Sequence, residues 1–403
     1  MLAKKKYLIF NILIFVMSWQ LTVCFVNYQK KNTVLITDTN SLAIYKTAWK
    51  ALNDKFYLNS STDIKSWENK FVHKIQDSED AHKYIKALTN ELHDPYTRFL
   101  SKEELEEERE FINSKLVGIG VKTSAQKPII LNVYPNSPAD HAGIKKNDYI
   151  LSINNQSTAF LSALNIHKLL KGKENTKVSL VIKRNNKVIP KTITRQNFDF
   201  NPVSSRLLAN NIGYIMIDSF ISENTPTLFE NEVRKFSKSN GLIIDVRDNS
   251  GGLLKNAIQI ADSLLSEGKI VTTVNKTEKV NEYANAHSIY KGNIVLLVNK
   301  NTASASEIFV AALKENNKAT VIGEKTFGKG LVQEVIELPD KSGLHVTVAE
   351  YLTPSGRSIN YIGIKPDKLI LQENKLLATA SRYLKNNKLI IAKNKSILDL
   401  SKS

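Results

Sequence analysis

The sequence predicts a multidomain protein of mixed α+β and α/β class. The chain has 403 residues, which is enough for two or three domains. Hydrophobic residues make up 42% and charged residues 24%, a composition that can bury real cores and that excludes a wholly disordered chain or a multi-span membrane protein. The apolar pattern changes along the chain. It predicts a helical region over 40–112, a β-rich module over 113–197, an α/β core over 198–370 and a basic helical tail over 371–403.

Residues 1–30 are predicted to be a signal anchor with a membrane-spanning helix. Three lysines at positions 4–6 precede an uncharged, mostly apolar run over 7–26, which as a helix would span roughly 30 Å of bilayer. The basic flank should stay cytoplasmic, so the rest of the chain is expected to be exported. The segment before Cys24 also resembles a lipoprotein signal, but Val23 is bulkier than usual there. An uncleaved anchor is therefore expected, with cleavage or lipidation left open.

Individual elements follow from apolar periodicity. In the β-rich module, β-type runs are expected at 118–122, 129–133, 149–153 and 177–183, with one helix over 160–170. In the core, the expected strands are 212–217, 242–246, 294–298, 320–322 and 331–336, and the expected helices are 253–265 and 304–315.

The net charge of +17 has two competing explanations. A nucleic-acid site would gather Lys and Arg in one stripe. Here the lysines are scattered along the chain, with the densest group in the tail, so a solvated basic surface near anionic lipid is favoured. Cys24 is the only cysteine, which excludes an intramolecular disulfide and a cysteine metal cluster.

A glycine-containing turn opens the β-rich module, and its backbone N–H groups could face a carboxylate. An exposed strand edge beside it could pair with an extended peptide. The stretch resembles a PDZ domain of bacterial proteases, with Asn136, Asn147 and Asn155 where that pattern usually has Gly. The resemblance implies that Leu164 lines the groove and that a loop grips the C-terminal carboxylate. That loop consists of Leu116, Val117, Gly118, Ile119, Gly120 and Val121. A purely structural β module is the alternative.

Three polar clusters lie in the core, at 241–252, 301–307 and 323–333. In the second, a serine at a helix start is either an ordinary N-cap or a hydroxyl beside free N–H groups that suit an oxyanion. The third has the glycine and lysine spacing of a Walker A loop. However, Gly330 stands where Ser or Thr must hold magnesium, and a strand follows rather than a helix, so nucleotide binding is rejected.

Lysine is the available general base for a hydrolase in this chain. No Gly-x-Ser-x-Gly motif and no HExxH spacing occurs, and the seven histidines mostly fall outside the polar clusters. Lys329 is flanked by glycines and apolar residues, and burial lowers a lysine pKa, so a neutral amine could take a proton from a serine hydroxyl. The alternative is a solvated surface lysine.

Together, these clusters resemble the C-terminal processing peptidases, or tail-specific proteases. The resemblance extends to 94–97, 351–357 and 363–367. It implies a core of the ClpP/crotonase-like type, with Ser304 rather than Ser306 as nucleophile and Lys329, 25 residues later, as base. By the same match, Gln333 helps to position the lysine. The oxyanion hole would use the backbone N–H of Ala305 and of Gly251 or Gly252.

The resemblance implies a serine endopeptidase that acts near the C-termini of other proteins, with no metal or organic cofactor. With the anchor, it places the catalytic part outside the cytoplasm, in the bacterial cell envelope. Protein tails and the membrane, through residues 7–26, are the expected partners, and nucleic acid is not. A homo-oligomer formed through 40–112 is left open. An inactive PDZ scaffold and a nucleic-acid or lipid binder are the alternatives from other classes.

Overall fold

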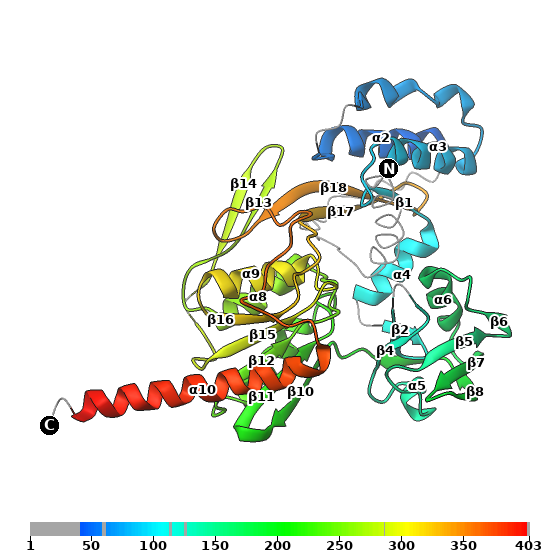
Figure 1. Ribbon diagram of the computed structural model, residues 1–403. Helices are drawn as coiled ribbons and strands as arrows, with labels where there is room; N and C mark the ends of the chain where they lie inside the picture. The colour runs from blue at the N-terminus through cyan, green and yellow to red at the C-terminus, as the bar shows by residue number, and fades with distance from the viewer. Residues whose placement is uncertain (1–40, 59–61, 113–114, 125–126, 286, 401–403) are drawn as a thin grey trace, which may run out of the picture. The chain divides into compact units, whose positions relative to one another are not determined.

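The computed structural model describes residues 41–58, 62–112, 115–124, 127–285 and 287–400. These residues form two compact units. The smaller unit is residues 106–201, and the larger one combines residues 41–105 with residues 202–400. Helix α4 (Lys102–Ile112) runs across the boundary between them (Figure 1). Because each unit has its own hydrophobic clusters, each is described separately.

A six-stranded sheet forms the centre of the larger unit, in the order β10-β11-β12-β15-β16-β19. Five strands run parallel and β10 is antiparallel at one edge. The strands are β10 (Val203–Leu208), β11 (Ile212–Ile217), β12 (Leu242–Asp245), β15 (Ile294–Val298), β16 (Ala319–Gly323) and β19 (Lys368–Leu369). Every residue of β12 and β15 is buried, which is why these strands read as continuous apolar runs.

Helices cover both faces of this sheet (Figure 1). One face packs against α7 (Thr225–Lys235), α8 (Leu254–Leu264) and α9 (Ala305–Glu315). The opposite face packs against α10 (Glu373–Leu400) through Leu376, Ala380 and Leu384. Alternate residues of each strand therefore enter different cores, as the two-residue period of a strand requires.

A second, five-stranded sheet joins the N-terminal helices to this core. Its order is β1-β18-β13-β14, with β17 also paired to β18. The strands are β1 (Arg98–Leu100), β13 (Lys269–Asn275), β14 (Lys279–Tyr283), β17 (Leu331–Glu337) and β18 (Gly343–Leu352). Helices α2 (Ser41–Lys55) and α3 (Ser78–Glu91) share a cluster with the β18 residues Leu344 and Val346. The predicted helical region thus contributes both helices and one strand to the larger unit.

Three short 3-10 helices complete the larger unit, at η2 (Ile64–Asn69), η3 (Val72–Lys74) and η4 (Ala209–Asn211).

The smaller unit is the β-rich module. Its four-stranded sheet has the order β6-β5-β7-β8, and β3 pairs with β4 and β2 with β9 in two further ladders. The strands are β2 (Lys115–Gly118), β3 (Val121–Thr123), β4 (Ile130–Val133), β5 (Tyr149–Ile153), β6 (Gln156–Ser157), β7 (Lys177–Arg184), β8 (Lys187–Thr194) and β9 (Gln196–Asp199). The helices are α5 (Pro138–His141) and α6 (Ala163–Leu170). Twelve buried residues, mostly Ile, form its core.

The three asparagines at the usual glycine places of this module have left-handed backbones. Their φ angles are 61° at Asn136, 72° at Asn147 and 65° at Asn155. Asn is one of the few residues other than Gly that adopts this region readily. These three turns therefore keep a left-handed backbone without glycine.

The expected strands of the core appear within one or two residues of their predicted bounds, and the tail is helical. The runs at 118–122 and 160–170 are shorter than expected. Gly120 interrupts the first with a φ of 79°, and the second becomes helical only at Ala163. The predicted membrane segment lies outside the described residues. No helix in the described ranges is long and apolar enough to cross a bilayer.

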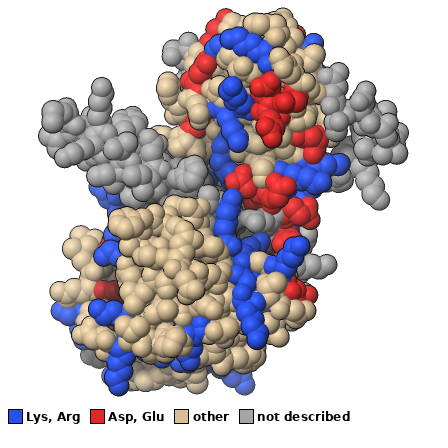
Figure 2. Space-filling view, turned by 90° about the vertical axis from the view of Figure 1, so that its right-hand side faces the viewer, with Lys and Arg blue, Asp and Glu red and all other residues tan. Residues whose placement is uncertain are grey.

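Charged side chains of both signs share the face drawn in Figure 2, where Lys and Arg lie among clusters of Asp and Glu. Several of the surface lysines are paired. For example, Lys55 Nζ lies 2.6 Å from Glu334, and Lys70 Nζ lies 2.7 Å from Glu91. Exposed pairs of this kind contribute about 0–1 kcal/mol each. The face drawn in Figure 2 therefore carries charges of both signs.

Candidate active site

Ser304 lies at a sharp turn between the buried strand β15 and helix α9. Its side chain is fully buried, and its backbone has φ 57° and ψ −123°. A non-glycine residue rarely adopts this conformation, which costs of order 1–3 kcal/mol and persists only where the surroundings enforce it. The turn places a hydroxyl beside the first N–H groups of a helix, at the positive end of the helix dipole.

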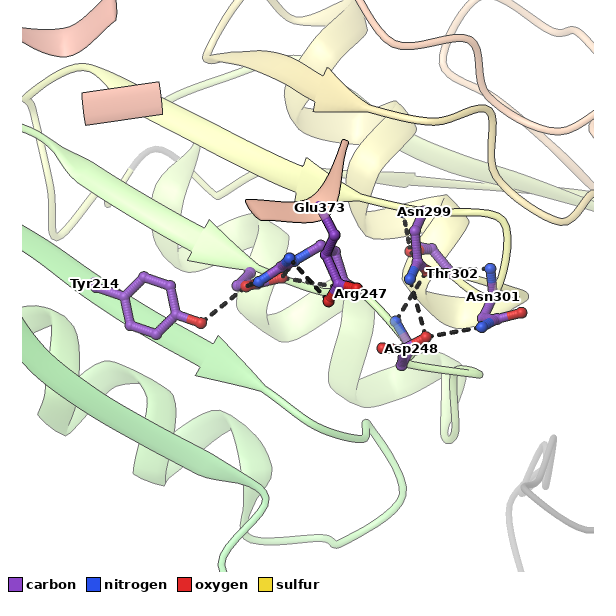
Figure 3. A network of polar contacts seen from close by, with 8 residues as sticks. Tyr214, Arg247, Asp248, Asn299, Asn301, Thr302 and Glu373 are labelled. Carbon is purple, nitrogen blue, oxygen red and sulfur yellow. Dashed lines mark hydrogen bonds and ion pairs between the residues drawn. The ribbon is translucent and has the colours of Figure 1, made fainter. Parts of the chain in front are cut away.

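Two loops at the carboxyl ends of neighbouring parallel strands enforce this turn (Figure 3). Asp248, after β12, accepts hydrogen bonds from the side chains of Asn299 and Asn301, after β15, at 2.9 and 2.8 Å. Thr302 Oγ1 donates to the carbonyl of Val246 at 2.8 Å. These hydrogen bonds therefore join the loop before Ser304 directly to the loop that carries Gly251 and Gly252.

Tyr214, Arg247 and Glu373 form the neighbouring part of the same network (Figure 3). Tyr214 donates its hydroxyl to Asp245 Oδ2 at 2.8 Å, and Arg247 Nε lies 2.9 Å from Asp245 Oδ1. The Arg247 guanidinium also reaches Glu373 of α10, at 3.4 Å. These bonds fix the end of β12 from two sides, so that the loop after it begins at a defined place.

Gly251 lies beside the serine, and Gly252 follows it against Phe220. A Cβ added to Gly251 would lie 2.9 Å from Ser304 Cβ and 3.0 Å from Ala305 N, so only glycine fits there. The N–H of Gly251 donates to Asn249 Oδ1 at 2.9 Å. The N–H of Gly251 is therefore already engaged within its own loop, which favours Gly252 over Gly251 as an oxyanion donor. Among the described residues, the N–H groups of Gly252 and Ala305 have no intramolecular acceptor.

Lys329 lies in the loop between β16 and β17 and is 8% exposed. Its Nζ lies 4.4 Å from the centre of the Tyr96 ring. The same loop joins the serine loop through the N–H of Phe327, which donates to the carbonyl of Thr302 at 2.9 Å. The interpretation of Lys329 as a solvated surface lysine is therefore wrong.

The carboxylate of Glu307 connects the serine turn to the lysine loop. Its Oε2 accepts from the backbone N–H of Ser304 at 2.9 Å and of Lys329 at 2.8 Å. Its Oε1 accepts from the N–H of Gly328 at 2.7 Å and from the Thr326 hydroxyl at 2.6 Å. Burial raises the pKa of Glu307 to about 7, against the opposing effect of these hydrogen bonds. One buried side chain thus holds the backbones of both candidate catalytic residues.

Gln333 lies on β17, directly opposite Thr347 of β18. Its Nε2 donates to Thr347 Oγ1 at 3.4 Å, and its buried Oε1 has no hydrogen-bond partner among the described residues. Thr347 Oγ1 in turn donates to Asp94 Oδ2 at 2.6 Å. The side chain predicted to help the lysine is therefore linked to the 94–97 turn.

Ser304, Lys329 and Gln333 are thus all buried in the larger unit, and the backbones of Ser304 and Lys329 are joined through Glu307. A hydroxyl beside backbone N–H groups can attack a carbonyl, and those groups can stabilise the resulting negative charge. In the part of the chain that the structure describes, no group of three His, Cys, Asp or Glu residues could hold a metal ion.

Comparisons with known proteins agree with this geometry. The family model of Peptidase family S41 matches residues 211–370, and that of the PDZ domain matches residues 129–184. The chain is 33% identical over 359 residues to the carboxyl-terminal-processing protease of Picosynechococcus sp., covering 85% of this chain and 86% of that protein. It is 34% identical over 342 residues to that of Synechocystis sp., covering 81% of this chain and 80% of that protein. The chain belongs to peptidase family S41, as a carboxyl-terminal-processing serine protease.

Solved structures give the same result for this protease. The photosystem II D1 C-terminal processing protease superposes with a TM-score of 0.65 at 28% identity, covering 83% of this chain and 94% of that one. A putative S41 protease from Bacteroides fragilis has a TM-score of 0.54 at 16% identity, covering 92% and 99% of the two chains, and shares the fold.

The β-rich module of the protease is the PDZ domain. Gly120, in the predicted carboxylate loop, has a φ of 79°, and a Cβ there would lie 2.1 Å from Ser137 Cβ. Val117 and Gly118 belong to β2, Ile119 is buried, and Val121 begins β3. Leu116 lies on β2 and Leu164 on α6, but their side chains lie outside the described residues. The predicted groove is therefore described only in its backbone and its glycine turn.

Sequence reasoning missed three features of the protease site. Glu307 lies in the second polar cluster, 301–307, but the sequence gives it no evident role. Its signal is the spacing Ser-x-x-Glu at a helix start, the pattern of a capping box. Asp94 and Tyr96 were noted only as part of the family resemblance. No local pattern could place them beside Gln333 and Lys329, because the contacts join residues more than 200 positions apart.

Proposed function

We propose that this protease cleaves proteins near their C-termini by attack of Ser304, with Lys329 as general base. The observation that carries the proposal is the shared carboxylate of Glu307, which binds the backbone N–H of both residues through one oxygen atom. A lysine must be uncharged to accept a proton, and a site with little water favours the uncharged form. The low exposure of Lys329 supports that role.

The proposed reaction has two steps. Ser304 Oγ attacks the carbonyl carbon of the scissile peptide while its proton passes to Lys329 Nζ. Collapse of the tetrahedral intermediate breaks the C–N bond, and the Lys329 ammonium returns the proton to the leaving amine. Water, deprotonated by the same amine, then attacks the acyl ester and releases a carboxylate with regeneration of the serine.

The oxyanion of each step is assigned to the backbone N–H groups of Gly252 and Ala305. Both are without an acceptor among the described residues, and Ala305 is the first residue of α9. Removal of one such donor typically costs a hundred- to a thousandfold in kcat. Gln333, buried beside Thr347, is assigned to the positioning of Lys329 from the strand that follows it.

The PDZ domain is proposed to capture the substrate tail. Among the described strands, β3 is hydrogen-bonded only to β4, which leaves its other edge for an added peptide strand. The turn at Gly118–Gly120 would face the terminal carboxylate with backbone N–H groups. Peptides that end in a free carboxylate should bind the protein more tightly than the same peptides with an amidated end.

The protease is further proposed to work outside the cytoplasm, anchored in the cytoplasmic membrane of a bacterial cell through residues 7–26. The three lysines before the apolar run support this orientation. Added protease should digest the full-length protein in spheroplasts but not in intact cells. Protection in spheroplasts, with digestion only after lysis, would contradict the proposal.

The catalytic assignment is tested with Ser304→Ala and Lys329→Ala in the full-length protein, assayed on a protein with a free, unstructured tail. Both variants should lose cleavage by at least about a thousandfold. Matched controls are Ser306→Ala, whose buried hydroxyl has no hydrogen-bond partner in the part of the chain that the structure describes, and Lys325→Ala, an exposed lysine of the same loop as Lys329. The controls should retain activity. Full activity of either active-site variant rules out the pair, and no labelling of Ser304 by a serine-reactive probe favours an inactive scaffold.

A further inference from the structure

The ring of Tyr96 covers the amine of Lys329. The centroid of the ring lies 4.4 Å from Lys329 Nζ, within the range of a cation–π contact. Tyr96 is 5% exposed and its hydroxyl has no hydrogen-bond partner among the described residues. The contact of Tyr96 with the lysine is therefore made by the face of its ring.

The position of this ring is fixed by strand β18. Asp94 Oδ2 accepts from Thr97 Oγ1 at 2.7 Å and from Thr347 Oγ1 at 2.6 Å, and its Oδ1 accepts from the N–H of Tyr96 at 3.2 Å. Thr97 Oγ1 also accepts from the N–H of Thr347 at 3.0 Å. The next residues form β1, which pairs with β18 from Arg98 onward. The turn that holds Tyr96 is thus tied to the strand that also carries the partner of Gln333.

Other ionisable groups face this place from each neighbouring element. Glu307 lies on α9 and binds the backbone of Lys329, Asp94 lies in the turn, and Tyr361 lies in the loop that packs against Gly328. Burial, with smaller contributions from Tyr361, Asp94 and Glu307, raises the pKa of Tyr96. Tyr96 therefore stays neutral across the working pH range and affects the amine through its ring, not through a charge.

We propose that Tyr96 is a positioning residue for Lys329, which holds Nζ in place and stabilises its protonated form through the ring face. This inference rests on the proposed role of Lys329 as general base. The ring restricts the amine to one side of the site and excludes water from it. Its negative face also favours the ammonium that forms when the serine proton is taken, so the ring lowers the barrier to that transfer.

The test is the pH dependence of kcat/KM in the full-length protein, with active sites counted by a serine-reactive probe. The acidic limb reports loss of the proton from the free enzyme's base. Tyr96→Leu keeps an apolar side chain but removes the ring face, so the ammonium loses its stabilisation. The limb should move to lower pH by roughly half to one unit, and kcat should fall roughly ten- to a hundredfold from lost positioning. Tyr96→Phe keeps the ring face and should leave the limb in place.

Tyr45→Leu is the matched control for a merely structural effect. Tyr45 is a fully buried tyrosine of the same N-terminal part, whose hydroxyl donates to the carbonyl of Trp67 at 2.6 Å, away from Lys329. This variant should lower the melting temperature without moving the limb. An unmoved limb in Tyr96→Leu, a shift to higher pH, or an equal shift in Tyr96→Phe overturns the inference. If Lys329→Ala is inactive in the same assay, such a result leaves the proposed function standing. An active Lys329→Ala would instead remove that function.

Discussion

Gly251→Ala is the perturbation that most directly tests the packing around Ser304. Gly251 has a φ of 105°, where an L-alanine is strained by about 1–2 kcal/mol. The new Cβ would lie 2.9 Å from the carbonyl oxygen of Ala303, 2.9 Å from Ser304 Cβ and 3.0 Å from Ala305 N. Overpacking against such atoms typically costs about 1–3 kcal/mol. The free energy of unfolding should therefore fall by about 2–5 kcal/mol.

Gly356→Ala separates these two costs. Gly356 has a φ of 82°, but a Cβ there would have no atom within 4 Å. This control should lose only the backbone contribution, about 1–2 kcal/mol. The difference between the two variants, measured by urea unfolding, then gives the packing contribution around the serine.

The same substitution should affect catalysis selectively. Relief of the contacts in Gly251→Ala displaces either the Ser304 side chain or the N–H of Ala305, so kcat should fall at least about a hundredfold in the protein that remains folded. Gly356→Ala should keep its kcat. Equal losses of stability in the two variants, or an unchanged kcat in Gly251→Ala, would refute the reasoning that only glycine fits beside the serine.

Three further outcomes are expected. Glu307→Gln should lower kcat by at least tenfold, because the amide nitrogen of Gln would face two N–H or O–H donors. Glu315→Gln is the control. Glu315 lies on the same helix but binds Arg357, so this variant should reduce stability alone. Folding raises the pKa of Glu307 from 4.5 to about 7, so the buried carboxylate lowers the free energy of unfolding as pH rises from 4.5 to 7. Between pH 4 and pH 8, wild type should therefore lose up to about 3 kcal/mol of this free energy relative to Glu307→Gln, as measured by urea titration. Asn147→Ala should lower the free energy of unfolding of the PDZ domain by about 1–2 kcal/mol, while Asn147→Gly stays close to wild type in urea unfolding; equal effects would mean that the φ of 72° is not what selects the residue.

Local patterns predicted the four central strands of the six-stranded sheet, β11, β12, β15 and β16, which are largely buried, but not the edge strands β10 and β19, which are mostly exposed. The run over Ile294–Val298 is apolar at every position and has the predicted bounds. The second sheet was harder to predict. Strand β14 is exposed at all five residues, so it carries no apolar alternation, and β1 is only three residues long. β14 pairs with the preceding strand β13 as a local hairpin, whereas β1 pairs with β18, more than 200 positions away, which no short window of sequence can show.

The candidate site likewise has residues that local sequence patterns predict and residues that only the fold places there. Ser304 and Lys329 could be named because each lies in a short cluster of glycines and small polar residues with a family spacing. Glu307 was overlooked because its spacing also fits a routine helix cap, and only its further bonds to Gly328 and Lys329 distinguish it. The place of Tyr96 depends on the pairing of β1 with β18, so its contact with Lys329 is a consequence of the fold.

The strained turn at Ser304 explains why so many polar groups gather around it. A backbone with φ 57° at a serine costs of order 1–3 kcal/mol, and an isolated loop would relax. Here the preceding residue donates its N–H to the carbonyl of Asn249 at 3.0 Å, while the serine's own N–H is bound to Glu307. A buried hydrogen bond contributes about 0.5–1.5 kcal/mol net, so these two bonds are of the size needed to offset the strain. Relaxation of the turn would leave buried partners unpaired on both sides. The reactive geometry is therefore maintained by the neighbouring loops, and loss of either bond should reduce kcat before it unfolds the protein.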